Sequence, residues 1–257
     1  MAFWTTFAQA RDYPFDARRT AAQWAQLHAG DQEPLPQDER LLAAWALYHS
    51  GAFQEAAEAG LAIGPAGLAV ANKATCIYAN YLESKERTRL SLFLTVAERA
   101  AAQAAVLPDD ASAQYWQAYA LGRYSQGISV AKALAQGVGE RVKLALEQAI
   151  RLRPLHAEAH ICLGAFHAEV IDKVGPLIGN MTYGARKDVS LALFQRSLSL
   201  TPQSAIAQME YANALVMLEG DDGMAQATQL YEQAANSQAR DAMEHLDREL
   251  AQTMLGN

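Results

Sequence analysis

Three histidines in one segment are the residues whose type and spacing most suggest chemistry. His156, His160 and His167 would form one stripe on an α-helix of 3.6 residues per turn. Two histidines four residues apart can share a zinc ion. A zinc site would also need a further Cys, Asp or Glu ligand, and none lies on this stripe. We therefore favour buried, hydrogen-bonded histidines and predict no metal site.

No other pattern predicts catalysis. The sequence contains no GxSxG, no Walker loop, no HExxH and no glycine-rich turn from strand to helix. We expect a protein that is not an enzyme and has no cofactor. Its two cysteines form no metal-binding pair, and two reduced thiols are the simpler interpretation.

Charge and hydropathy exclude further function classes. The net charge of -7 and the pI near 5.4 argue against nucleic-acid binding, which usually needs a basic surface. The N-terminal residues lack the pattern of a secretory signal, and no stretch approaches the roughly 18 apolar residues of a membrane span. We expect no membrane-spanning segment and a cytoplasmic location.

Two long stretches, residues 111–139 and 173–187, contain no acidic residue. Both are rich in glycine and in apolar residues that would be unfavourable in water. They could pack on each other as a secondary core, or they could wall a pocket or groove for an anionic or amphipathic ligand. For the second interpretation, the basic candidates on this insert edge are Lys132, Lys173, Arg186 and Lys187.

The elements that carry these residues are predicted to be helices. About one residue in five is alanine, the best helix former, whereas valine and isoleucine are sparse. A first helix is expected after Asp16, its N-cap, with Gly30 just past its end. Pro108, Pro154 and Pro202 lie 46 and 48 residues apart, each between two helix-like segments. Such spacing indicates stacked repeats of one supersecondary unit.

The repeats resemble tetratricopeptide repeats (TPRs), which are helical hairpins with a Trp-x2-Leu-Gly-x2-Tyr, Ala-x3-Phe, Pro pattern. The matching positions are Leu121–Gly122, Leu163–Gly164, Phe194 and Pro202, with Ser190 in place of an alanine, and Ala227, Tyr231 and Ala234 in the last unit. The resemblance implies an all-α fold, an α-α superhelix of about five hairpins that begin near Asp38, Leu68, Ala111, Leu155 and Gln203. The domains expected are an N-terminal helix and linker (1–36), the repeats (37–236) and a C-terminal capping helix (237–257).

The acid-free stretches fall at the same place in two successive repeats. The small residues of successive first helices, Gly122, Gly164 and Ala212, are 42 and 48 residues apart, whereas a plain TPR has 34 residues. The extra residues map to the turn between the two helices of the third and fourth hairpins. Because repeats stack in register, both inserts are predicted on the same edge.

The TPR resemblance also implies a function, namely binding of a partner peptide in the concave groove lined by the first helix of each hairpin. The implied groove residues are Tyr48, Asn80, Trp116, Tyr119, Arg123, Gln126, Met209 and Asn213. The carboxylate clamp of chaperone-docking relatives is incomplete, because Leu41 and Tyr119 stand where its lysines are expected. His160 and His167 fall at the packing Trp and Tyr positions of the repeat, which favours a core role.

Two alternatives stay open. The aromatic residues of the groove could plug it or pack against the N-terminal helix. The ligand could be a small apolar or amphipathic molecule, held in a groove walled by the inserts of the third and fourth repeats, instead of a protein.

Overall fold

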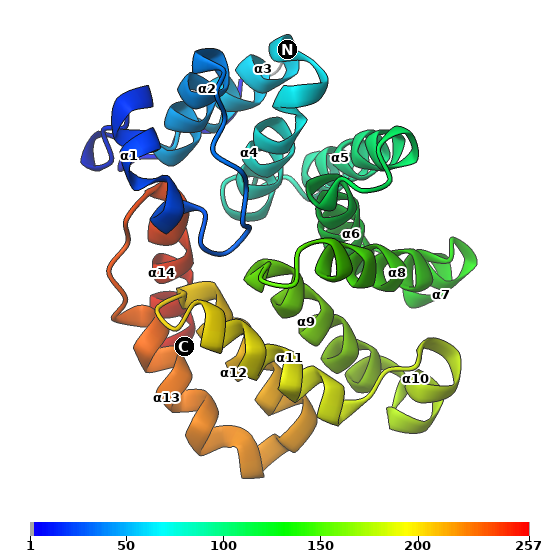
Figure 1. Cartoon of the computed structure of the whole chain (residues 1–257). Helices are drawn as coiled ribbons and strands as arrows, with labels where there is room; N and C mark the ends of the chain where they lie inside the picture. Colours follow the sequence, from blue (N-terminus) through cyan, green and yellow to red (C-terminus); the bar gives the residue numbers. More distant parts are fainter. Residues whose placement is uncertain (1–2, 257) are drawn as a thin grey trace. The chain divides into compact units, whose positions relative to one another are not determined.

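The computed structural model describes residues 3–256, which form α-helices, short 3-10 helices and turns, with no β-strand among them (Figure 1). None of the helices in this range is long and apolar enough to cross a membrane. The chain forms two compact units. Unit 1 contains the chain up to His28, Gln32–Leu152 and Arg240–Met243, and unit 2 contains Ala29–Asp31, Arg153–Ala239 and the chain from Glu244 on. The boundary falls within the predicted repeat domain, 37–236.

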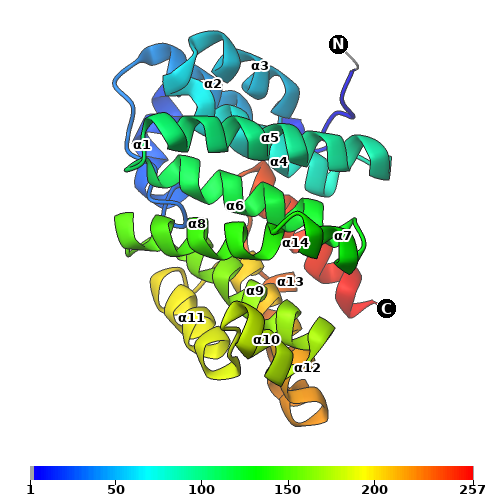
Figure 2. The same ribbon diagram turned by 90° about the vertical axis from the view of Figure 1, so that its right-hand side faces the viewer.

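Unit 1 consists of three helical hairpins preceded by one helix. Its helices are α1 (Ala17–Leu27), α2 (Glu39–His49), α3 (Phe53–Ile63), α4 (Leu68–Tyr81), α5 (Glu86–Val106), α6 (Ala111–Gln126), α7 (Val130–Ala135) and α8 (Val138–Leu152). The hairpins are α2 with α3, α4 with α5, and α6 with α8, and α1 packs against α2. Figure 2 shows α5, α6 and α8 lying one beside the next, as expected for stacked repeats.

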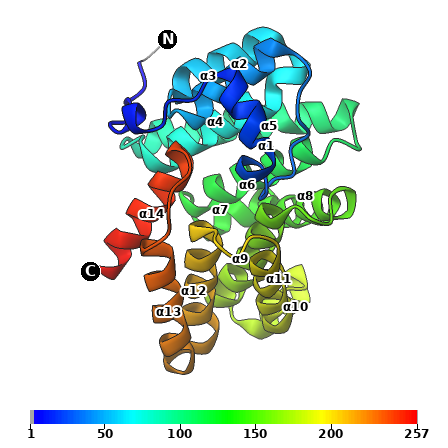
Figure 3. The same cartoon turned by 60° about the vertical axis from the view of Figure 1, so that its left-hand side comes forward.

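Unit 2 contains the last two hairpins and most of the C-terminal cap. Its helices are α9 (Ala157–Val174), α10 (Pro176–Tyr183), α11 (Lys187–Leu200), α12 (Ala205–Glu219), α13 (Met224–Ala235) and α14 (Ala242–Leu255). The first two residues of α14, Ala242 and Met243, belong to unit 1. Helix α9 pairs with α11, and α12 pairs with α13, as Figure 3 shows for the second pair. With unit 1, these hairpins account for the five that the sequence predicts.

The helix starts follow from local chemistry. Asp16 caps α1, because its carboxylate accepts the backbone N–H of Arg19 at 2.7 Å. Asp110 caps α6 in the same way, through the N–H groups of Ser112 and Ala113. Pro108, Pro154 and Pro202 all lie in the turns between hairpins, where no helical N–H is lost.

The close contact of α9 with α11 confirms the predicted repeat register. A Cβ on Gly164 would lie 2.9 Å from the ring of Phe194, which is fully buried. The hydroxyl of Ser190 donates to the carbonyl oxygen of Gly164 at 2.7 Å. Phe194 in turn stacks on Tyr211 of α12, with ring centroids 5.3 Å apart. The serine that replaces the repeat's alanine therefore links the two helices by a hydrogen bond.

Both inserts fold as short, separate helices. The third-repeat insert forms α7 between α6 and α8, and its N-cap Ser129 accepts the N–H of Lys132. The fourth-repeat insert forms α10, which begins at Pro176 and is followed by its C-cap, Gly184, in the left-handed conformation (φ +63°). Helix α10 packs on α9, the first helix of its own hairpin.

Candidate functional site

In the first repeat, the predicted groove residue Tyr48 lies in the interior. Its side chain is 1% exposed and contacts Trp45, His49 and Phe53. Its hydroxyl donates to the sulfur of Met243 at 2.7 Å. Its neighbour Trp45 packs edge-on against Trp24 of α1, so the N-terminal helix lies next to this aromatic group. Tyr48 is thus a core residue, closed off from a ligand.

The third repeat presents a partly exposed polar strip on α6. Trp116 is buried against Tyr115 and Tyr119, but Tyr119 and Arg123 are partly exposed and Gln126 is exposed. The guanidinium carbon of Arg123 lies 5.4 Å from the centre of the Tyr119 ring, and its Nη1 donates to Oε1 of Gln126 at 3.3 Å. We call Tyr119, Arg123 and Gln126 the α6 strip. Its members hold one another in place.

The second repeat contains one predicted groove residue, Asn80. Asn80, near the end of α4, is partly exposed. One turn earlier on α4, the buried thiol of Cys76 lies close enough to Arg123 to feel its charge. Asn80 therefore lies one turn after Cys76, the α4 residue that is near Arg123 of the α6 strip.

In the fifth repeat, the structure separates the two predicted groove residues. Met209 is buried with Ala234 of α13 and Ala251 of α14, so the capping helix covers it. Asn213 is partly exposed and accepts the hydroxyl of Tyr231 at 2.5 Å through Oδ1. Its amide nitrogen lies 3.3 Å from a carboxylate oxygen of Glu210. Asn213 therefore has an evident role in linking α12 to α13.

The three histidines of α9 and its N-cap are buried and hydrogen-bonded, as predicted. Nδ1 of His156 accepts the N–H of Ala159 at 3.2 Å, which caps the helix, and Nδ1 of His160 lies 2.9 Å from the carbonyl oxygen of His156. Nδ1 of His167 accepts the N–H of Arg186 at 3.3 Å. Burial lowers the pKa of His160 more than the carbonyl contact raises it.

The basic residues of the insert edge lie at the surface. In unit 2, Lys173 pairs with Glu169 at 3.5 Å, Lys187 pairs with Glu219 at 2.8 Å, and Arg186 pairs with Asp188. Each of these three charges is thus balanced by an acidic residue, from just outside the acid-free stretch for Lys173 and Arg186 and from the end of α12 for Lys187. Lys132, in unit 1, lies 5.8 Å from the centre of the Tyr124 ring.

The apolar residues of the fourth-repeat insert are strongly exposed. Leu177 is 73% exposed, Ile178 57% and Met181 80%, all on the eight-residue helix α10. Single exposed apolar residues are ordinary, but three on two turns form a patch that is typical of interaction sites. We call Leu177, Ile178 and Met181 the α10 patch.

A surface hollow of about 460 Å³ lies beside the third-repeat insert. Leu90, Leu94 and Ile128 supply apolar walls, Arg87 and Lys132 supply positive charge, and Glu86 supplies negative charge. Gly127 allows the insert to approach α5 here, because a Cβ at this position would lie 2.4 Å from Leu90. The described lining comes from the third-repeat insert and from α5 and α6, whereas the sequence predicted walls from two inserts.

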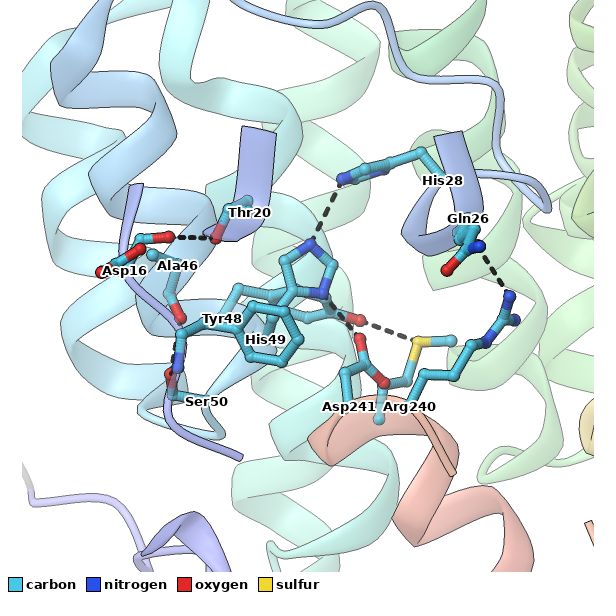
Figure 4. A network of polar contacts seen from close by, with 12 residues as sticks. Asp16, Thr20, Gln26, His28, Ala46, Tyr48, His49, Ser50, Arg240 and Asp241 are labelled. Carbon is cyan, nitrogen blue, oxygen red and sulfur yellow. Dashed lines mark hydrogen bonds and ion pairs between the residues drawn. The ribbon is translucent and has the colours of Figure 1, made fainter. Parts of the chain in front are cut away.

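Unit 1 contains a buried polar network formed by His28, His49 and Asp241 (Figure 4). No feature of the sequence predicts this network. Nδ1 of His49 lies 2.6 Å from the carboxylate of Asp241, 192 residues away, and its Nε2 lies 3.3 Å from Nε2 of His28. All three residues are buried. The arrangement fits a neutral His49 that donates to Asp241 and accepts from His28. It joins the end of α1, the end of α2 and the segment 240–243.

No protein-family model matches this sequence, and no curated protein is similar to it. Among solved structures, the chain resembles a thermophilic TPR protein from Thermus thermophilus. The TM-score is 0.58 at 17% identity, over 83% of this chain and 97% of the other. At this identity the likeness concerns the fold. The chain therefore has the all-α, TPR-like helical repeat fold that its sequence predicts.

Proposed function

We propose that this protein is a non-enzymatic interaction module that binds a protein partner. The observation that carries the proposal is the TPR-like fold, an architecture whose stacked hairpins present extended binding surfaces. Within unit 1, the contact surface is the α6 strip together with Asn80. An arginine stacked on a tyrosine is pre-oriented, so little side-chain entropy is lost when it engages a partner.

This surface revises the set of contact residues. Tyr48, Trp116 and Met209 are buried and act as core residues. Tyr119, Arg123 and Gln126 combine an aromatic face, a guanidinium and an amide, a mixture suited to a peptide with acidic and apolar side chains. The α10 patch supplies apolar contact area in unit 2.

The proposal is tested by affinity capture from cells that express the protein at its native level. The variant Tyr119→Ala/Arg123→Ala removes the aromatic face and the charge of the α6 strip. The matched control, Arg141→Ala, removes an exposed arginine from α8, the second helix of the same hairpin. A partner that is lost from the first variant and retained by the control supports the proposal. Equal recovery by both variants contradicts it.

A second candidate function, binding of a small amphipathic molecule, is favoured by the hollow beside α7. The hollow is open, with apolar walls for a chain and a net positive lining, from Arg87 and Lys132 against Glu86, for an anionic head group. Native mass spectrometry of the purified protein should then show an adduct that Ile128→Trp, which fills the hollow, abolishes. Val106→Trp is the control, because Val106 is 78% exposed and lies outside the hollow. An adduct-free wild-type mass contradicts this candidate.

A further inference from the structure

A buried amide and a guanidinium meet between the two helices of the second hairpin. Asn72, on α4, is fully buried, and Arg99, on α5, is partly buried. Nε of Arg99 donates to Oδ1 of Asn72 at 2.7 Å. This single hydrogen bond uses the acceptor of the amide and one of the five N–H donors of the guanidinium.

Two further donor atoms of this pair have no acceptor. Nδ2 of Asn72 and Nη2 of Arg99 are both buried, and neither has a hydrogen-bond partner within residues 3–256. On a guanidinium, Nη2 lies on the same edge as Nε, which is the edge that faces Asn72. Two buried donor nitrogens without an acceptor are therefore carried by two residues that are already hydrogen-bonded to each other.

The charge of Arg99 is also unbalanced. Within the same residues, no Asp or Glu side chain forms an ion pair with Arg99. Burial lowers the pKa of its guanidinium, and the neighbouring group with an opposite effect is the thiol of Cys76. That thiol supplies little negative charge, because burial raises its own pKa. Arg123 also lies within electrostatic range of Cys76, which adds positive potential.

Physical principles make such an arrangement unfavourable unless something completes it. A buried donor without an acceptor loses the free energy of its lost hydration, and a buried charge is normally paired. A water molecule could accept a hydrogen bond but would leave the charge unbalanced. A negatively charged acceptor answers both requirements, because charge-assisted hydrogen bonds to a guanidinium are strong.

We propose that Asn72 and Arg99 form a binding site for a small oxyanion. The oxygens of the anion accept from Nη2 of Arg99 and Nδ2 of Asn72 and balance the guanidinium charge. Access is from the side of Arg99, which is partly exposed, whereas Asn72 is fully enclosed. The two binding residues belong to neither the α6 strip nor the α10 patch; the strip contributes only the positive potential of Arg123.

The oxyanion could be free phosphate or the carboxylate of another molecule, and the test separates these sources. Thermal unfolding is followed in sodium phosphate, sodium acetate and sodium chloride at matched pH and ionic strength. A ligand of the folded state should raise the midpoint in a saturable manner, by about 3 °C or more at concentrations well above its Kd. A rise in phosphate identifies a phosphate site, and a rise in acetate identifies a carboxylate site.

Two variants make the assignment specific. Asn72→Asp introduces a carboxylate that can pair with Arg99 itself, so this variant should be more stable than wild type in chloride and should not respond to added oxyanion. Arg141→Ala, which removes a distant exposed arginine, should respond as wild type does. The proposal is overturned if neither oxyanion exceeds chloride, or if Asn72→Asp and wild type respond equally.

Discussion

The buried contact between His49 and Asp241 should stabilise unit 1 far more than a surface ion pair of the same type. The perturbation is Asp241→Ala. It removes the acceptor 2.6 Å from Nδ1 of His49 and leaves an imidazole N–H buried without a partner. Such a loss costs about 1–3 kcal/mol. With a urea m-value of about 2 kcal/mol/M, a loss of about 2 kcal/mol lowers the unfolding midpoint by about 1 M.

Tryptophan fluorescence is the appropriate assay for this prediction. The four tryptophans, Trp4, Trp24, Trp45 and Trp116, all belong to unit 1, so the signal reports that unit alone. Two of them contact the polar network directly through His28. The ring of His28 stacks on Trp24 with centroids 3.9 Å apart and packs edge-on against Trp45 with centroids 4.6 Å apart. The control is Glu147→Ala, which breaks the surface pair with Lys143 on α8 of unit 1 and should leave the midpoint nearly unchanged. Equal midpoints for the two variants would refute the reasoning.

The same contact predicts how stability depends on pH. Burial lowers the pKa of His49 despite the nearby carboxylate, and His28 and Lys73 act in the same direction as burial. The unfolded chain therefore binds a proton near pH 6.5 that the folded chain binds only at lower pH. Unit 1 should lose stability as the pH falls below about 6.5, by at most about 1.4 kcal/mol per pH unit from this group.

The variant His49→Gln isolates this effect, because glutamine does not titrate. It should be less stable than wild type at a pH of about 7.5, and its stability should fall less steeply towards a pH of about 5.5. His160 in unit 2 also has a pKa lowered by burial, but unit 2 contains no tryptophan and does not contribute to the signal. Parallel pH profiles for wild type and His49→Gln would show that His49 is not the titrating group.

Three further predictions concern other parts of the molecule. Gly164→Val should destabilise unit 2 by about 1–3 kcal/mol, measured by circular dichroism during urea unfolding, because its side chain would collide with the ring of Phe194; an unchanged midpoint would contradict the packing described. Cys76 should resist alkylation in the native protein and react after denaturation, as peptide mass spectrometry can quantify, because it is buried with a raised pKa; rapid native labelling would contradict this. Met181→Glu should leave the unfolding midpoint nearly unchanged and weaken capture of the partner, whereas Thr182→Glu on the same exposed helix should weaken it less; equal effects would remove the α10 patch from the interface.

Much of the fold could be predicted because it depends on local signals. Pro154, the Leu163–Gly164 pair and Phe194 carry the spacing of one hairpin, and the structure has the Gly164–Phe194 contact that this spacing requires. The insert in each of two successive hairpins was also predictable, because the spacing between successive repeats exceeds that of a plain TPR. That each insert forms its own short helix depends on Ser129, the N-cap of α7, and on Pro176, the first residue of α10, whose positions at helix starts emerge only with the fold.

The burial of the groove residues could not be predicted in the same way. The repeat pattern predicts Tyr48 and Met209 at groove positions, but segments outside the repeats cover both side chains. Met243 contacts Tyr48 from 195 residues away, and Ala251 of the capping helix packs with Met209. A repeat pattern describes each hairpin and its neighbours, so it carries no information on where the two chain ends pack. For the same reason the sequence did not predict the contact between His49 and Asp241.

Site-specific photocrosslinking in the native cell tests the proposed interaction most directly. A photoreactive amino acid replaces Gln126, which is exposed on the α6 strip, and in a separate variant replaces Glu147, which is exposed on α8. We predict that position 126 crosslinks to a discrete protein partner, that position 147 does not, and that Arg123→Ala abolishes the crosslink. Crosslinking of the same partner from both positions, or from position 147 alone, would contradict binding through the α6 strip.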